Sequence, residues 1–409
     1  MRAAFALTSL LTATSAEAAP LTYAAALQIA TGSAPAVEAR ALAVRAAQSA
    51  SRAAGALPDP KVSVGVNDFP ISGPLAGRPR LDNFSMVTFG YSQDVPNTAK
   101  RQARSERART DISAAEAEVV VAQRKVRVAT ALAWVDAYYA ERRLAALDDI
   151  SKEIETEVQT APAQLASGSI RPALALVPRQ AVANLDDRRA ALVAELAKAH
   201  AQLLRWVGGD DPVSTAGSPP SDSVDPVRLR AGLDGLPDLR LAAASILQAQ
   251  AAANEAKAEK RPDWGYEIQY SHRDPLFGDY ISGKVTFSLP IFAKTRQDPV
   301  IEARLADVNR SAVEREDTRR ELKADLDGGL ADHVMHHEQL ERARETLIPL
   351  ARQQSRLELA SYAAGSATLA EVLNSVRALI EARLSALDLE AQTVRDGARL
   401  NLTYGSDDQ

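Results

Sequence analysis

The chain has 409 residues, which is longer than one ordinary globular domain, so we expect several domains or one elongated architecture. Its formal net charge of -5, from 48 basic and 53 acidic residues, gives no electrostatic indication of a nucleic-acid partner. The absence of cysteine excludes disulfides, thiolate metal sites, a cysteine nucleophile and an acylated N-terminal cysteine.

The first 18 residues have the pattern of a signal peptide. Arg2 precedes a mostly apolar run, and Ala16-Glu17-Ala18 has the small-x-small pattern of a signal peptidase site. We expect cleavage after Ala18 and export from the cytoplasm; the alternative is an ordinary apolar first helix. This run is too short to span a bilayer, and no later stretch approaches the ~18 to 20 apolar residues of a transmembrane helix. Any membrane residence is therefore expected to come from strands.

The rest of the chain contains the same pattern twice. The corresponding pairs are PNTAKRQ at 96–102 with PIFAKTRQ at 290–297, VTFGY at 87–91 with VTFSL at 285–289, and LASGS at 165–169 with YAAGS at 362–366. A period of roughly 200 residues indicates a duplicated half, because solenoid units repeat every ~20 to 50 residues. The predicted segments are a first repeat at 19–209, a linker at 210–236, a second repeat at 237–405 and a C-terminal tail at 406–409.

Each repeat is predicted to run helix, two strands, very long helix, break, helix. The long helices cover about 100–168 and 294–365, and at 1.5 Å per residue each exceeds ~70 Å. Helices of this length need lateral partners, which the returning helices at 168–208 and 365–405 supply. Gly168 and Gly365 then mark the tips of two helical hairpins. An apolar stripe with helical spacing supports pairing along the second long helix and comprises Leu322, Leu326, Leu330, Val334, Leu340, Leu347 and Leu350.

Four segments alternate apolar and polar residues with the period of a two-faced strand. They lie at about 61–70, 84–95, 263–272 and 280–290, and they are rich in aromatic residues. Such strands are typical of outer-membrane barrels with interfacial aromatic girdles. The alternative is a small periplasmic sheet that places one face on a core.

Four strands cannot close a barrel, because about eight are needed even to fill the interior with side chains. An open edge in lipid would leave backbone groups unpaired, so the chain is expected to share its barrel with identical copies. Three copies would supply twelve strands, continued by an α-helical coiled-coil tunnel. The predicted fold class is thus mainly α with a membrane β-barrel portion. The polar strand positions expected to line the lumen are Lys61, Asn67, Glu267, Gln269 and Lys284.

These segments together resemble the TolC-like outer-membrane factors. The similarity covers LTYAAALQIA near the start, PDP and RPD before each first strand, VTFSLPIF and YAAGSATLAEVLNSVRAL. It implies a homotrimer in the cell outer membrane, with its helical tunnel in the periplasm docked onto a periplasmic adaptor and an inner-membrane pump. SQDVPNTAKRQ is most similar to the branch that serves heavy-metal cation efflux.

The resemblance also implies that the second hairpin tip closes the tunnel, using a tyrosine, a basic residue and rings of carboxylates. Tyr362 and Glu371 match that pattern, whereas Ala367 occupies the basic position and Asn374 the second acidic one. Three copies of Glu371 near an axis would repel one another and attract cations. The alternative reading of Glu371 is a solvated helix face.

Other chemistry is sparse in the sequence. His333 and His337 are one helical turn apart and are weak candidates for a metal pair, since no carboxylate or thiolate cluster completes the site. No phosphate loop, nucleophile elbow or paired catalytic carboxylates are present, so we expect neither an enzyme nor a cofactor.

Two functions remain open at this point. The first is a passive efflux channel for heavy-metal cations, or otherwise for drugs or other small molecules. The second is a soluble periplasmic coiled-coil scaffold or adaptor. The sequence does not identify the exported substrate, the particular pump and adaptor, or whether the gate is open.

Overall fold

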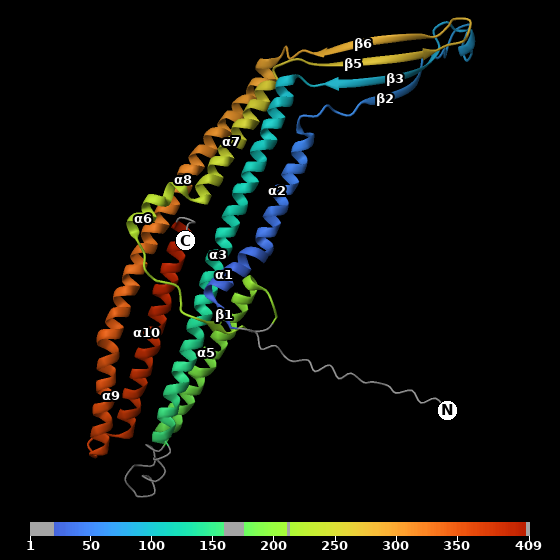
Figure 1. Ribbon diagram of the computed structural model, residues 1–409. Coiled ribbons are helices and arrows are strands. Elements are labelled where there is room, and N and C mark those ends of the chain that lie inside the picture. The colour runs from blue at the N-terminus through green and yellow to red at the C-terminus, as the bar shows by residue number, and fades with distance from the viewer. Residues whose placement is uncertain (1–19, 159–175, 211–212, 406–409) are drawn as a thin grey trace, which may run out of the picture. The chain divides into compact units, whose positions relative to one another are not determined.

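The computed structural model describes residues 20–158, 176–210 and 213–405 (Figure 1). The predicted signal peptide, the hairpin tip at Gly168 and the C-terminal tail lie outside the described residues. The element order recurs as the duplicated sequence predicts, because a helix, two strands and a long helix followed by another helix occur twice.

The elements of the first repeat are β1 (Leu21–Thr22), α1 (Tyr23–Ser33), α2 (Pro35–Ala54), β2 (Lys61–Asn67), a 3-10 turn (Pro79–Leu81), β3 (Met86–Val95), α3 (Thr98–Val158) and α5 (Val177–Val207). The predicted linker contains β4 (Thr215–Ala216), α6 (Pro226–Gly232) and a 3-10 turn (Leu233–Gly235). The second repeat comprises α7 (Pro237–Ala258), β5 (Asp263–His272), β6 (Tyr280–Ser288), α8 (Ala293–Arg342), α9 (Ile348–Ala363) and α10 (Leu369–Tyr404).

Two compact units divide the chain, and neither coincides with a sequence repeat. One contains Met1–Ala34, Arg124–Arg230 and Asp325–Gln409, and the other contains Pro35–Gln123 and Ala231–Ala324. We call the first the helical unit and the second the strand unit. Each unit takes segments from both repeats, so the two halves of the duplicated sequence fold against each other.

The strand unit contains one antiparallel four-stranded sheet in the order β2-β3-β5-β6 (Figure 1). Both predicted hairpins form, and β3 pairs with β5 from Val87–His272 to Val95–Trp264 to join them. The hairpin from the first repeat thus becomes continuous with the hairpin from the second.

The helical unit has an aromatic core around Trp134 on α3. Trp134 is fully buried, stacks on Tyr138 and meets Tyr23 edge-on. Its Nε1 donates a 2.9 Å hydrogen bond to the backbone oxygen of Leu21, and β1 pairs in parallel with β4 beside it. This core anchors the first described strand of the chain to the long helix.

The second long helix continues from α8 into α9 through one π-helical turn at Ala343–Leu347. Pro349 follows this turn and has no N–H to donate, which accounts for a local break in the α-helical pattern. Within the predicted apolar stripe, Leu326, Leu330 and Leu340 are buried. Val334, Leu347 and Leu350 of the same stripe are exposed in the single chain.

The predicted linker packs closely on the last helix. A Cβ at Gly397 of α10 would lie 2.8 Å from the backbone of Asp222, so only glycine permits this approach. Asn401 Nδ2 also donates to the Ser223 backbone oxygen at 2.9 Å.

None of the described helices combines the length and the apolar character needed to cross a membrane.

Candidate functional site

The four-stranded sheet has one apolar face and one polar face, which the register of its strands aligns. Val64, Phe89, Tyr270 and Ile281 lie opposite one another across the four strands, and all four side chains are exposed. Large exposed apolar surfaces mark contacts with membranes or with other proteins. The apolar face is thus the candidate contact surface of this sheet.

The sequence-predicted lumen residues lie together on the opposite face. Lys61, Glu267 and Lys284 fall in a single cross-strand row that also includes Ser92 of β3. Gln269 occupies the adjacent row, and Asn67 lies at the far end of β2 on the same face. Register therefore brings all five predicted residues onto one surface.

Charges on the polar face pair with one another. Lys61 Nζ lies 2.7 Å from Asp94 Oδ2, and Lys284 Nζ lies 4.0 Å from Glu267 Oε2. Each of these lysines thus lies beside a carboxylate, and the polar face carries both charge signs. Sequence reasoning missed Asp94, although its place two residues beyond Ser92 in an alternating strand indicates the same face.

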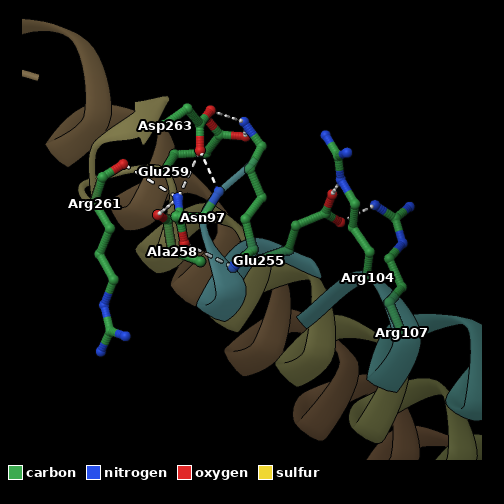
Figure 2. A network of polar contacts seen from close by, with 9 residues as sticks. Asn97, Arg104, Arg107, Glu255, Ala258, Glu259, Arg261 and Asp263 are labelled. Atoms are coloured by element: carbon green, nitrogen blue, oxygen red, sulfur yellow. Dashed lines mark hydrogen bonds and ion pairs between the residues drawn. The ribbon is translucent and has the colours of Figure 1, made fainter. Parts of the chain in front are cut away.

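A polar clasp fixes the sheet to the helices below it (Figure 2). Asn97, between β3 and α3, donates from its backbone N–H and from Nδ2 to Asp263 Oδ1 at 2.7 and 2.8 Å. Its Nδ2 also lies within hydrogen-bond distance of the backbone oxygens of Ala258 and Arg261. Asn97 Oδ1 accepts the backbone N–H of Lys100 and so caps the start of α3.

Lys100 completes the clasp from the first turn of α3. Only 9% of this residue is exposed, and its Nζ lies 2.6 Å from Glu259 Oε1 and 3.3 Å from Asp263 Oδ2. One turn further along, Arg104 and Arg107 both bind Glu255 of α7 (Figure 2). The clasp joins the end of the first hairpin to the start of the second.

The tip of the second hairpin ends α9 with a tight cap. Gly365 has φ of +74°, its N–H donates to the Tyr362 oxygen, and the Ser366 N–H donates to the Ser361 oxygen. These two bonds form a Schellman motif, in which the left-handed position favours glycine. The side chain of Tyr362 is partly buried against the cluster of Leu369 and Leu373. Two of the predicted gate residues thus shape the turn itself.

Glu371 serves as a helix-capping residue in the single chain. Its Oε2 accepts from the Thr368 backbone N–H at 2.7 Å and from the Thr368 hydroxyl at 2.9 Å, while Thr368 Oγ1 faces the Glu371 N–H. This reciprocal arrangement is a capping box at the start of α10. The Thr368 backbone N–H, together with the Thr368 hydroxyl, lowers the pKa of Glu371 from its ordinary value.

We expect Thr368→Ala to destabilise the first turn of α10 by about 1 kcal/mol, because the N-cap hydroxyl is lost. Amide hydrogen exchange at Ala370–Leu373 measures this change. Glu371→Gln is the matched variant: it keeps an acceptor for the capping box and removes the charge.

The lowered pKa of Glu371 also sets a pH dependence. Its charge-assisted stabilisation is complete above the ordinary pKa of a glutamate and disappears as the pH falls through the lowered folded-state pKa. In thermal melts followed by circular dichroism, the wild type should have a higher melting temperature than Glu371→Gln near neutral pH. The difference in melting temperature should disappear in acid. A gap that persisted in strong acid would show that the carboxylate charge does not stabilise the cap.

Asn374 lies exposed beside a groove between α5 and α10. The groove has a volume of about 360 Å³ and is lined by Asn184, Arg188, Asn374, Arg377 and Glu381 together with buried leucines and Ile380. The family resemblance implies a second acidic residue at this position. Asn374 is instead a neutral amide, and it shares the groove with Arg188 and Arg377.

The histidines of α8 do not assemble a metal centre. His333 and His337 stack with ring centroids 6.4 Å apart, and His336 Nδ1 binds Asp396 Oδ2 at 2.7 Å. Burial lowers the pKa of His333 below its usual range, which favours the neutral ring. Within the described ranges, no group of three or more histidine, cysteine, aspartate or glutamate side chains could hold a metal ion. The candidate pair His333 and His337 therefore gains no third ligand.

The fold is shared with solved structures of membrane proteins. A membrane protein from Pseudomonas aeruginosa matches with a TM-score of 0.81 at 15% identity, over 94% of this chain and 90% of that one. CusC, described with transmembrane channel formation, matches with a TM-score of 0.79 at 18% identity, over 94% and 92% of the two chains. The outer membrane protein VceC from Vibrio cholerae matches with a TM-score of 0.74 at 16% identity, over 94% and 96%. No curated protein sequence matches the chain significantly.

The deciding observation comes from the sequence of the second repeat. The profile of the family described as Outer membrane efflux protein matches residues 231–406. The second repeat of the chain is thus similar in sequence to the outer membrane efflux proteins. This confirms the resemblance found in the sequence. The matched region includes β5, β6, α8, α9 and α10, so the similarity covers half of the four-stranded sheet and the complete second helical hairpin.

Proposed function

We propose that three copies of this efflux protein form a passive channel across the outer membrane, with the polar face of each sheet lining the lumen. The exposed apolar face of the sheet carries this proposal, because a soluble scaffold would not expose a four-residue apolar row across every strand. In the described chain β2 and β6 are outer strands with one neighbour each. Open edges are costly in lipid, and twelve strands from three copies would remove them.

The helices below the sheet would continue the channel as a coiled-coil tunnel in the periplasm. The resemblance to TolC-like proteins supports a periplasmic adaptor and an inner-membrane pump as partners, with transport driven by the pump. Tyr362, Gly365, Glu371 and Asn374 are proposed to form the periplasmic gate, with Gly168 at the other hairpin tip. The capping role of Glu371 gives this carboxylate a fixed position from which three copies could attract cations.

Heavy-metal cations are the proposed cargo, with drugs or other small molecules as the alternative. This part rests on the resemblance of SQDVPNTAKRQ to the heavy-metal branch. Two residues of that motif, Asn97 and Lys100, belong to the clasp and have a structural role. Exposing a deletion strain to a panel of metal salts and drugs, with the plasmid-borne gene as control, tests the cargo directly.

Two adjacent residues on β5 test whether the sheet lies in lipid. Ile268 is on the apolar face and Gln269 on the polar face. We expect Ile268→Lys to prevent stable insertion, because lysine facing the middle of a bilayer costs about 2–4 kcal/mol. Gln269→Lys should insert normally and shift the ion selectivity of the channel in planar bilayers. Equal outer-membrane yields for the two variants, together with unchanged selectivity, would contradict the channel.

A further inference from the structure

The clasp between β3 and β5 is a junction between the two sequence repeats, formed inside one chain. It combines two features: the strand register from Val87–His272 to Val95–Trp264, and the ion pair of Lys100 with Asp263. Lys100 is almost buried by this contact. The duplicated sequence contains a second lysine and a second aspartate at the positions of Lys100 and Asp263, whereas Ile291 stands at the position of Asn97.

This second set has no partner within the described chain. Lys294 in PIFAK corresponds to Lys100 in PNTAK, and Asp59 in PDP corresponds to Asp263 in PDW. Both Lys294 and Asp59 are exposed, and neither takes part in an ion pair among the described residues. They lie at opposite outer strands of the sheet, Lys294 just after β6 and Asp59 just before β2.

The internal register also indicates how the outer strands would meet. Ile268 lies opposite Tyr91 in the β3–β5 pair. By the PNTAK–PIFAK and PDP–RPD correspondences, Tyr91 maps onto Val285 and Ile268 maps onto Val64. The hairpin registers support this alignment over the VTFGY–VTFSL match, which differs by four residues, because Val62 lies opposite Tyr91 as Tyr266 lies opposite Val285. Val285 and Val64 belong to the apolar face and are 57% and 67% exposed. If these two residues pair between copies, the apolar side chains of both copies lie on the same face of the joined sheet.

We propose that β6 of one copy pairs antiparallel with β2 of the next, with Val285 opposite the partner's Val64, and that Lys294 binds the partner's Asp59. The contact between copies thus repeats the Lys100–Asp263 ion pair that helps to join β3 to β5 within one molecule. This proposal rests on the proposed trimeric channel and adds to it a strand register and an ion pair.

Cysteine crosslinking tests the register, because the natural chain contains no cysteine. Within one chain β3 and β5 separate β2 from β6, and three strand spacings of ~4.8 Å are too far for a disulfide. Val285→Cys combined with Val64→Cys should therefore give covalent oligomers up to trimer, with no crosslink inside a monomer.

The matched controls shift the register by two residues. Val285→Cys with Val62→Cys, and Val285→Cys with Val66→Cys, place the thiols diagonally, beyond the Cβ separation of a disulfide. We expect a several-fold larger covalent yield for the Val64 pair under the same oxidation in outer-membrane fractions. A larger yield for either shifted pair would overturn the proposed register.

A charge exchange tests the ion pair. Lys294→Asp and Asp59→Lys, each alone, should lower the temperature at which the oligomer dissociates in detergent, and the double variant should recover most of the loss. If the wild type forms no oligomer in the outer membrane, the proposed channel fails as a whole. If the oligomer forms but the double variant gives no recovery, the inferred Lys294–Asp59 contact is wrong while the channel proposal stands.

Discussion

Asn97→Ala is expected to lower the free energy of unfolding by about 2–4 kcal/mol, combining a lost helix cap with lost hydrogen bonds in a partly buried network. Asn97 Oδ1 caps α3 through the Lys100 N–H, and Nδ2 donates toward Asp263, Ala258 and Arg261. The alanine variant keeps only the backbone bond to Asp263. Urea unfolding in detergent, followed by circular dichroism, measures the change.

Two further variants separate the contributions within Asn97. Asn97→Ser keeps a hydroxyl that can cap α3 but removes the Nδ2 donors. Its free energy of unfolding should therefore lie between those of the wild type and Asn97→Ala. Asn309→Ala is the control, because Asn309 lies exposed on α8 and alanine favours a helix more than asparagine. Should Asn97→Ala unfold at the same urea concentration as the Asn309 control, the clasp would not stabilise the junction.

The clasp also shows why part of the site was hidden in the sequence. Asn97 and Asp263 are 166 residues apart, and no periodicity relates an asparagine after one strand to an aspartate before another. The repeat pattern relates PNTAKRQ to PIFAKTRQ and PDP to RPD, and it does not indicate that Asn97 and Asp263 touch. To predict a contact between non-equivalent ends of two repeats, one must know which strands are neighbours in the sheet.

The strand faces, in contrast, follow directly from the sequence. A strand places alternate residues on opposite faces, so Lys61, Glu267 and Lys284 had to share a surface once their strands paired in register. The apolar stripe of α8 was less reliable. Val334 of α8 and Leu350 of α9 are exposed in the single chain, and sequence spacing alone does not show what covers an apolar stripe.

Local signals near the tip could have been read further. Thr368 and Glu371 have the spacing of a capping box, which identifies both the start of α10 and a structural role for the carboxylate. The family resemblance implies a gate role for the same carboxylate. The two roles are compatible, because a carboxylate held by its own helix end would keep a defined position in the proposed assembly.

Trp134→Ala is expected to have the largest effect on stability of any single substitution considered, at about 3–5 kcal/mol. Trp134 is fully buried on α3, stacks on Tyr138, meets Tyr23 edge-on and bonds the Leu21 oxygen. Its removal leaves a cavity in the core of the helical unit and an unpaired carbonyl in β1. Because β1 lies soon after the predicted signal peptidase site, the mature N-terminus should also become sensitive to protease.

Trp134→Phe distinguishes the packing from the hydrogen bond. Phenylalanine keeps an aromatic ring between Tyr23 and Tyr138 but cannot donate to Leu21, so a loss of about 1–3 kcal/mol is expected from the unpaired oxygen and the smaller ring. Circular dichroism melts and limited proteolysis of both variants give the comparison. If Trp134→Ala left the N-terminal segment as resistant as wild type, β1 would be held by its pairing with β4 and not by the aromatic core. If melting temperature and protease resistance both rise from Trp134→Ala through Trp134→Phe to the wild type, Trp134 anchors the first strand.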